Sequence, residues 1–212
     1  MSGIYIHIPF CKQACHYCDF HFSTNLKKKD EMVLALAKEI EMRKSEFQDE
    51  IVETIYFGGG TPSILQIADL KFLIDAVYKN YKVVENPEIT VEANPDDLTE
   101  NRIIELSNNK VNRLSIGIQS FFEDDLQLMN RAHNVEEAKK CLEIATHYFD
   151  NISIDLIYGV PEMSNEKWLQ NIETALSFGV PHISSYALTV EPKTALHSFI
   201  QKGIIPQPDD EV

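Results

Sequence analysis

Short runs of apolar residues alternate along the chain with longer segments in which apolar residues recur every third or fourth position. The runs are typical of strands buried in a sheet, and the longer segments are typical of helices with one apolar face. The pattern predicts six strand–helix units, with strands at residues 4–8, 52–57, 88–93, 114–118, 152–157 and 183–188. Residues 120–134 form a longer connection after the fourth strand, and Ser63 and Gln66 have capping-box spacing before the second helix.

This alternation predicts an all-parallel α/β sheet with the helices packed outside it. Unusual polar residues lie where strands end, at Glu92, Gln119, Asp155 and Tyr186, and in barrels that rim holds the active site. We therefore expect an incomplete parallel (β/α)6 TIM-like barrel with a lateral opening, a doubly wound open sheet being the alternative. Residues 206–211 look like a helix start with no helix after it, so we expect residues 1–212 to be one domain of a longer protein.

Composition and charge narrow the class of protein. The 212 residues are 44% hydrophobic and 25% charged, as in ordinary globular proteins with a sizeable core. The net charge of -14 argues against nucleic acid or an anionic membrane as a partner, and no apolar run reaches the length of a membrane span. Without a secretory segment, we expect a cytoplasmic protein whose cysteines stay reduced.

Three of the four cysteines, Cys11, Cys15 and Cys18, follow the first strand as C-x3-C-x2-C. Cysteine thiolates are the standard ligands of iron–sulfur clusters, and a cluster of four irons held by three thiolates leaves one iron open to a substrate or cofactor. A structural zinc site completed by His16 or His21 is the alternative, although the chain has no second ligand pair of the usual zinc kind. Cys141 lies in a helical pattern and is expected to be a buried, inert thiol.

Glycines and a histidine stand near the first two strands. Residues 58–62, Gly-Gly-Gly-Thr-Pro, follow a strand directly, so a ligand can approach the backbone there; a tight strand-to-helix turn explains them equally well. His7 is expected to be a satisfied core histidine rather than a proton-transfer group. Tyr5 has the same parity as His7, so both side chains should lie on one face of the sheet.

Carboxylates near buried strand ends need a partner or a ligand. Glu92 and Asp155 are suited to hydrogen-bond ribose hydroxyls or an amino group, and the alternative is a salt bridge to Arg113 or Arg131. Gln119 donates and accepts at once, which suits a zwitterionic ligand. Arg131 is suited to a carboxylate, although an arginine in a loop is more often a surface charge.

The motifs that carry this chemistry also occur in a recognisable order. Together they resemble the radical S-adenosylmethionine (SAM) proteins of the oxygen-independent coproporphyrinogen III oxidase group, from Tyr5 to about Ala187. The resemblance is carried by Tyr5-x-His-Ile-Pro-Phe-Cys-x3-Cys-x-Tyr-Cys, Phe57-Gly-Gly-Gly-Thr-Pro-Ser, Glu92-Ala-Asn-Pro, Gly117-Ile-Gln-Ser-Phe, Arg131-Ala-His and Asp155-Leu-Ile-Tyr-Gly-x-Pro.

The resemblance implies a [4Fe-4S] cluster on Cys11, Cys15 and Cys18, with SAM on the open iron through its amino and carboxylate groups. An electron donor such as flavodoxin or ferredoxin would reduce the cluster, which would cleave SAM to methionine and a 5′-deoxyadenosyl radical. By likeness to the family, the SAM site would be lined by Tyr5, Tyr17, Gly59, Gly60, Thr61, Glu92, Gln119, Arg131, Asp155 and Ala187.

Two differences from the pattern of the true oxidases indicate which branch of the group this chain resembles. The true oxidases of the group share a fourth cysteine two residues after the third, where this chain has Phe20. They also share an extra segment before the first strand, where this sequence has three residues. Both departures favour the HemW-like branch, which resembles a haem chaperone that binds haem and delivers it to a recipient protein. The alternatives are an oxidase acting on coproporphyrinogen III and a zinc-stabilised, non-catalytic binding barrel. The resemblance assigns no haem ligand among the residues of this chain.

Overall fold

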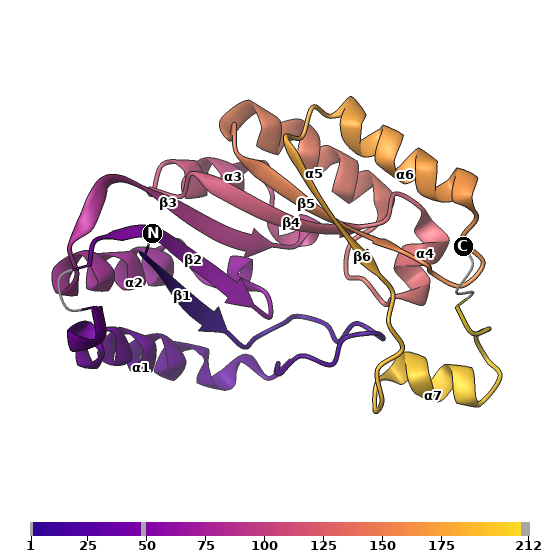
Figure 1. Cartoon of the computed structure of the whole chain (residues 1–212), viewed down its shortest axis with the longest axis horizontal. Coiled ribbons are helices and arrows are strands. Elements are labelled where there is room, and N and C mark those ends of the chain that lie inside the picture. The colour runs from indigo at the N-terminus through magenta and orange to yellow at the C-terminus, as the bar shows by residue number, and fades with distance from the viewer. Residues whose placement is uncertain (1, 48–49, 209–212) are drawn as a thin grey trace.

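The six strands form one parallel sheet in the order in which they occur in the chain. The computed structural model describes residues 2–47 and 50–208. Its strands are β1 (Ser2–Ile8), β2 (Val52–Gly59), β3 (Val83–Ala93), β4 (Arg113–Gln119), β5 (Ile152–Tyr158) and β6 (His182–Ala187). Each strand pairs in parallel with the next, so β1 and β6 are the two edges of an open sheet (Figure 1). The predicted incomplete (β/α)6 barrel is confirmed.

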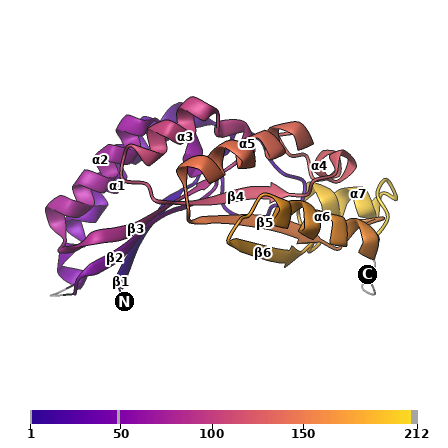
Figure 2. The ribbon, with the colours of Figure 1, turned by 90° about the horizontal axis from the view of Figure 1, so that it is seen from above.

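Most of the helices cover the outer side of this sheet, whereas α4 and α7 lie beside its carboxyl end (Figure 1). The helices are α1 (Lys29–Met42), α2 (Ile67–Asn80), α3 (Glu100–Ser107), α4 (Glu123–Leu128), α5 (Val135–Tyr148), α6 (Asn165–Ser177) and α7 (Ala195–Gln201). Figure 2 shows α1, α2, α3 and α5 along one side of the curved sheet. Side chains of the central strands, such as Ile55, Val91, Ile116 and Ile154, are fully buried against them. No helix in the described part of the chain is both long enough and apolar enough to cross a membrane.

The two faces of β1 differ as its alternating pattern requires. Ile6 and Ile8 are buried in the core, whereas Tyr5 and His7 lie together on the inner, concave face. The predicted shared orientation of Tyr5 and His7 is confirmed, and it turns this strand into one wall of the functional cavity.

Three local features differ from the expectations. β3 begins at Val83, five residues before the predicted start at residue 88. The prediction missed this first half because residues 85–87, Glu-Asn-Pro, are of types that are rare in strands. The N-cap of α2 is Gln66, which forms a capping box with Asp69, while Ser63 donates to Asp97 over 2.6 Å. The connection 120–134 contains the short helix α4. Residues 206–208 have no regular structure, and the remainder of the predicted helix start lies outside the described residues.

A second, smaller core lies beside the carboxyl end of the sheet. It joins α4, the end of β5 and α7, and its buried members are Leu126, Met129, Ile157, Val160, Met163, Leu188 and Leu196. Tyr17, from the segment that carries the cysteines, packs against it. The cysteine-bearing segment is therefore supported by residues from the second half of the chain.

Candidate functional site

A cavity of about 580 Å³ opens at the carboxyl ends of the strands, on the concave side of the sheet. Because parallel strands end at one edge, residues far apart in sequence meet there. Every predicted site residue lines this cavity: Cys11, Cys15, Cys18, Tyr5, Tyr17, Gly59, Gly60, Thr61, Glu92, Gln119, Arg131, Asp155 and Ala187. Their roles toward a ligand stay predictions.

The cysteines lie on an ordered loop, residues 10–23, which we call the cysteine loop. Its two ends are joined by hydrogen bonds from the Cys11 N–H to the Ser23 carbonyl (3.1 Å) and from the Ser23 N–H to the Pro9 carbonyl (2.9 Å). Its middle is held by Asn130, whose side chain donates to the Ala14 carbonyl (2.7 Å) and whose carbonyl accepts from Gln13 Nε2 (2.9 Å). These hydrogen bonds fix the position of the loop relative to β1 and to the connection after β4.

His16 is directed away from the cavity. Its Nδ1 lies 2.8 Å from the Leu128 carbonyl oxygen, and its ring packs edge-on against Phe199 with 5.0 Å between the ring centres. Its backbone N–H donates to the Met129 carbonyl (3.0 Å), and its carbonyl accepts from the Leu196 N–H (2.8 Å). His16 is thus a structural residue of the cysteine loop and is not placed to complete a zinc site with the three thiols, whereas His21, the other histidine considered for that site, lines the cavity.

The thiols of Cys11, Cys15 and Cys18 line one common cavity. Within the described residues, no three His, Cys, Asp or Glu side chains converge closely enough to hold a single ion. The three thiols nevertheless share the cavity and influence one another: burial raises the pKa of Cys11 and Cys18, and the neighbouring cysteines raise it further. Three soft thiolates spread around a common space match the donor set of an iron–sulfur cluster. Cys141, by contrast, is 2% exposed, and burial raises its pKa to about 12, as expected for an inert thiol.

The glycine run shapes the cavity wall between the cysteine loop and the sheet. A Cβ atom on Gly60 would lie 2.6 Å from the Phe10 carbonyl oxygen and 3.0 Å from Sγ of Cys11. Gly59 has φ +114°, and its N–H donates to Glu92 Oε2 over 3.0 Å. Both glycines are thus required by the fold itself, and they bring the backbone to the cavity surface.

The two carboxylates of the cavity are not satisfied by arginine. Glu92 accepts hydrogen bonds from the Tyr56 hydroxyl (2.8 Å) and the Gly59 N–H (3.0 Å). Burial, followed by the charge of Glu92, raises the pKa of Asp155 to about 6. Among the described residues, neither carboxylate forms a salt bridge to Arg113 or Arg131, so the salt-bridge alternative does not hold. Both retain free acceptor capacity toward a ligand with hydroxyl or amino groups.

Arg131 is a partly buried residue with several polar contacts rather than a surface charge. Its guanidinium donates to Cys15 Sγ (3.3 Å), the Tyr17 hydroxyl (3.4 Å), Asn94 Oδ1 (2.7 Å) and the Gly117 carbonyl (3.0 Å). Its Nε is buried and has no partner within the described residues. A buried N–H of a charged guanidinium needs a hydrogen-bond acceptor. The free Nε of Arg131, close to the thiols, therefore fits a site that binds a ligand with a negatively charged or acceptor group.

Gln119 enters the cavity because β4 is irregular at its end. The register between β4 and β5 shifts between Gly117 and Gln119, and Gln119 has φ 66°. A Cβ on Gly117 would lie 2.8 Å from Gln119 Nε2, so glycine at this position lets the amide take its present place in the cavity. A positive φ in a non-glycine residue is uncommon and often marks a functional position.

Two cavity residues, His7 and Asn94, were not predicted from the sequence as part of the site. His7 is exposed in the cavity, where its Nδ1 lies 3.1 Å from the Tyr5 hydroxyl, so the predicted core histidine is wrong. Alternation from Ile6 and Ile8 already contained that information. Asn94, which bonds both Arg131 (2.7 Å) and Thr61 Oγ1 (3.4 Å), also lines the cavity. Its position at the end of a strand, next to Glu92, was the clue.

A family model described as the Radical SAM superfamily matches residues 5–175. The chain belongs to this superfamily. Its membership explains why the cysteine loop, the glycine run and the carboxylates share one rim, since the radical SAM fold implies a [4Fe-4S] cluster and SAM as its cofactors.

Curated relatives cover the whole of this radical SAM chain. The haem chaperone HemW of Bacillus subtilis is 39% identical over 214 residues, which cover 100% of this chain and 56% of the relative. HemW of Escherichia coli is 37% identical over 211 residues, 98% of this chain and 55% of the relative. The chain spans about half the length of the curated relatives it matches.

A solved structure supports the same fold. Coproporphyrinogen III oxidase (HemN) of Escherichia coli superimposes with a TM-score of 0.86 at 28% identity, over 97% of this chain and 48% of that one. The methyltransferase TsrM of Kitasatospora setae has a TM-score of 0.69 at 12% identity, which is evidence for the radical SAM fold alone.

Proposed function

We propose that this chain is the cluster- and SAM-binding domain of a haem chaperone, which binds haem and delivers it to a recipient protein. The observation that carries the proposal is the 39% identity to HemW along the entire chain, combined with three cysteines on one cavity wall. Phe20, at the position of the fourth cysteine of the oxidases, favours the chaperone branch. Haem ligands are not assigned to any residue of this chain.

In this proposal the thiolates of Cys11, Cys15 and Cys18 hold the cluster. When bound and reduced, the cluster supplies the electron for reductive cleavage of SAM. Glu92 and Asp155 would accept hydrogen bonds from the hydroxyl and amino groups of SAM, and the glycine run at Gly59 and Gly60 would let SAM approach the backbone. Tyr5, Tyr17, Thr61, Gln119 and Ala187 complete the walls around it.

Arg131 has an electrostatic part in the proposed site. Its partly buried positive charge beside Cys15 and Tyr17 offsets part of the negative charge of three thiolates and a carboxylate-bearing ligand. Because the cavity is partly shielded from water, this compensation is stronger than it would be at the surface. The cavity thus accommodates an anionic cluster in a chain whose net charge is -14.

The second candidate function is SAM-dependent oxidation of coproporphyrinogen III. The structural similarity to HemN favours it, with a TM-score of 0.86 over 97% of the chain. It requires turnover of a porphyrinogen, whereas a chaperone requires stoichiometric haem binding without turnover.

Reconstitution under anaerobic conditions tests the proposal. We expect iron and sulfide in equal amounts, a visible chromophore that changes on addition of SAM, and saturable binding of haem. A protein with zinc and no iron, or with a chromophore indifferent to SAM, would contradict it. Formation of protoporphyrinogen from coproporphyrinogen III would instead establish the oxidase function.

A further inference from the structure

The connection between β4 and α5, residues 120–134, is the part of the chain that holds the cysteine loop. Met129 accepts from the His16 N–H, Asn130 bonds Gln13 and Ala14, and Arg131 donates to Cys15. Three consecutive residues thus contact four consecutive residues of the loop. The position of residues 129–131 therefore determines the position of the cysteine loop.

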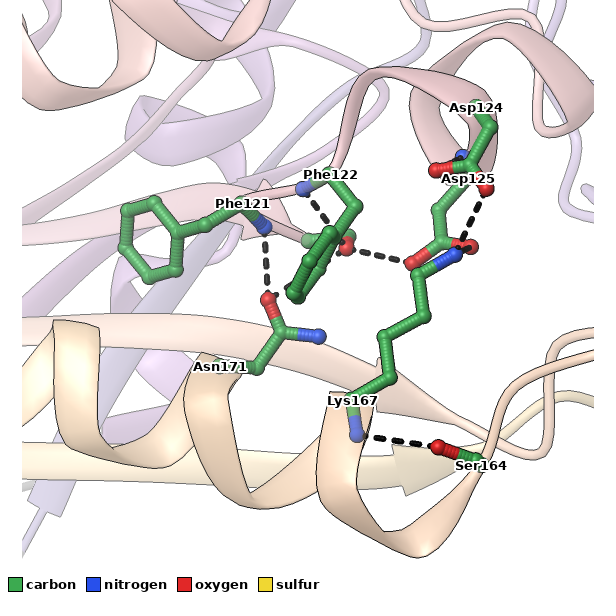
Figure 3. Close-up of polar contacts among 8 residues, drawn as sticks. Phe121, Phe122, Asp124, Asp125, Ser164, Lys167 and Asn171 are labelled. Carbon is green, nitrogen blue, oxygen red and sulfur yellow. Dashed lines mark hydrogen bonds and ion pairs between the residues drawn. The ribbon is translucent and has the colours of Figure 1, made fainter.

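The start of the connection is fixed by a polar cluster that is buried against α6 (Figure 3). Asn171 Oδ1 accepts from the Phe121 N–H over 2.7 Å, and the Ser120 hydroxyl donates to Asp125 Oδ2 over 2.6 Å. Lys167 Nζ lies 2.6 Å from Asp125 Oδ1 and 2.8 Å from Asp124 Oδ2. We call Ser120, Asp125, Lys167 and Asn171 the α6 cluster.

Because the α6 cluster is buried, the negative charge of Asp125 needs a positive partner. Asp125 is 2% exposed, and Ser120 and Asn171 are fully buried. A buried carboxylate must be paired and hydrogen-bonded, and Lys167 provides the positive partner here. Without Lys167, Asp125 would be a buried charge with only a hydroxyl facing it, and the favourable outcome would be for α4 to move toward water.

Such a movement would pass directly to the cysteines. Asp125 belongs to α4, whose carbonyls hold the next residues: the Asp125 carbonyl accepts from the Met129 N–H and the Leu126 carbonyl from the Arg131 N–H, each over 2.9 Å. From Met129 and Arg131 the contacts continue to His16 and Cys15. The path from α6 to the cysteine loop contains only hydrogen bonds and one short helix.

We propose that Lys167 and Asn171 are positioning residues for the metal site, which from α6 fix the connection that holds the cysteine loop. The inference rests on the proposed function, in that the loop is taken to hold a cluster. Neither residue lines the cavity, and their effect on the thiols is exerted through Asp125, α4 and Arg131.

Two rates measured on the same chain test this. In cluster-free protein carrying Cys141→Ala, the rate at which a chromogenic disulfide modifies the remaining thiols reports the order of the loop. In reconstituted protein, the rate at which an iron chelator bleaches the chromophore reports cluster retention. We expect Lys167→Met to raise both rates by about tenfold, the lower end of the effect on metal affinity that is typical when residues that orient metal ligands are replaced. Lys167→Arg, which can still face both aspartates, should restore them, and Lys140→Met, an exposed lysine on α5, should change neither.

A double variant separates positioning from general stability. Asp125→Asn with Lys167→Met removes both charges, so no unpaired carboxylate is left to draw α4 toward water, and we expect both rates to return toward those of the unmodified protein. Rates that stay high in the double variant although its thermal midpoint recovers would overturn the proposal, as would unchanged rates in folded Lys167→Met protein. If the unmodified protein takes up no iron, the proposed function fails, while the thiol-modification rates still decide whether α6 positions the loop.

Discussion

The guanidinium of Arg131 lies 3.3 Å from Sγ of Cys15, although 116 residues separate them in the chain. The same guanidinium binds Asn94 at the end of β3 and the Gly117 carbonyl in β4. One partly buried side chain thus connects the cysteine loop to two strands of the sheet. Four predictions follow from this and the neighbouring contacts, and each is checked by a separate measurement.

Replacing Arg131 should affect the thiols before any cofactor is bound. The charge of Arg131 lowers the pKa of Cys11, against the larger opposing effect of burial. Arg131→Met should therefore raise the pKa of Cys11 further, and it should cost about 3 kcal/mol of unfolding free energy because buried acceptors lose a charged donor. Titration of thiolate absorbance in cluster-free protein and chemical denaturation measure the two effects. Arg43→Met, at an exposed position on the outer side, should show neither.

The three loop cysteines should differ sharply from the fourth. Cys11→Ala, Cys15→Ala and Cys18→Ala should each abolish the brown chromophore of anaerobically reconstituted protein, since each removes one cluster ligand. Cys141→Ala should retain it, because that thiol is buried in α5 away from the cavity. Iron and sulfide analysis with visible spectroscopy provides the measurement. A chromophore that persists in the Cys15 variant would show that the ligand set is wrong.

A single methyl group should disturb the metal site through the backbone. The Cβ of Gly60→Ala would meet the Phe10 carbonyl at 2.6 Å and Cys11 Sγ at 3.0 Å, so the cysteine loop must shift. We expect loss of most of the cluster while circular dichroism remains that of a folded protein. Gly179→Ala is the matched control: its φ of +69° makes an added side chain cost about 1 kcal/mol, yet no atom lies within 4 Å of the new Cβ.

Asp155→Asn should have effects of opposite sign on stability and binding. The pKa of Asp155 is raised to about 6 by burial and by Glu92, so the folded protein favours the protonated form. The stabilising contribution of the protonated form is fully present below the unfolded value near 4 and is lost as pH rises through 6. Asp155→Asn should therefore raise the unfolding free energy at pH 7 by up to about 3 kcal/mol, and by little at pH 4.

Binding provides the second half of that test. If ionised Asp155 accepts from SAM, the affinity of the unmodified protein for SAM should rise between pH 5 and 7, following a group with a pKa of about 6. Asp155→Asn should weaken binding and flatten this dependence. Calorimetric titration across this range measures it. A steep pH dependence that survives in the variant would assign the titration to another group.

Sequence alone predicted the six strands because buried parallel strands are nearly continuous apolar runs, as at 152–157. It missed the first half of β3, where Pro87 and its polar neighbours oppose strand formation but tertiary pairing with Val52 overrides them. It also missed α4, whose six residues are too few to show a helical period. Elements with strong local patterns were predictable, and those set by distant contacts were not.

The residues of the candidate site likewise include some that could be predicted from local sequence and some that depend on distant contacts. Glu92 and Gln119 could be predicted as rim residues because β3 and β4 end there, and Asp155 because it is a carboxylate in an otherwise apolar strand. The approach of Arg131 to Cys15 could not, since it depends on how α4 and the connection 120–134 fold over the loop. Similarly, His7 was placed in the core although alternation with Ile6 and Ile8 directs it to the cavity.

The contact between His16 and α7 has a consequence for how the protein is made. The cysteines leave the ribosome early, but the Leu196 N–H that bonds His16, and the Phe199 ring that packs on it, are translated near the end of the 212 residues. The thiols are thus synthesised well before Leu196 and Phe199, which complete the support of their loop. Metal insertion that depends on the finished pocket belongs after translation of this domain, when the nascent chain has closed on itself.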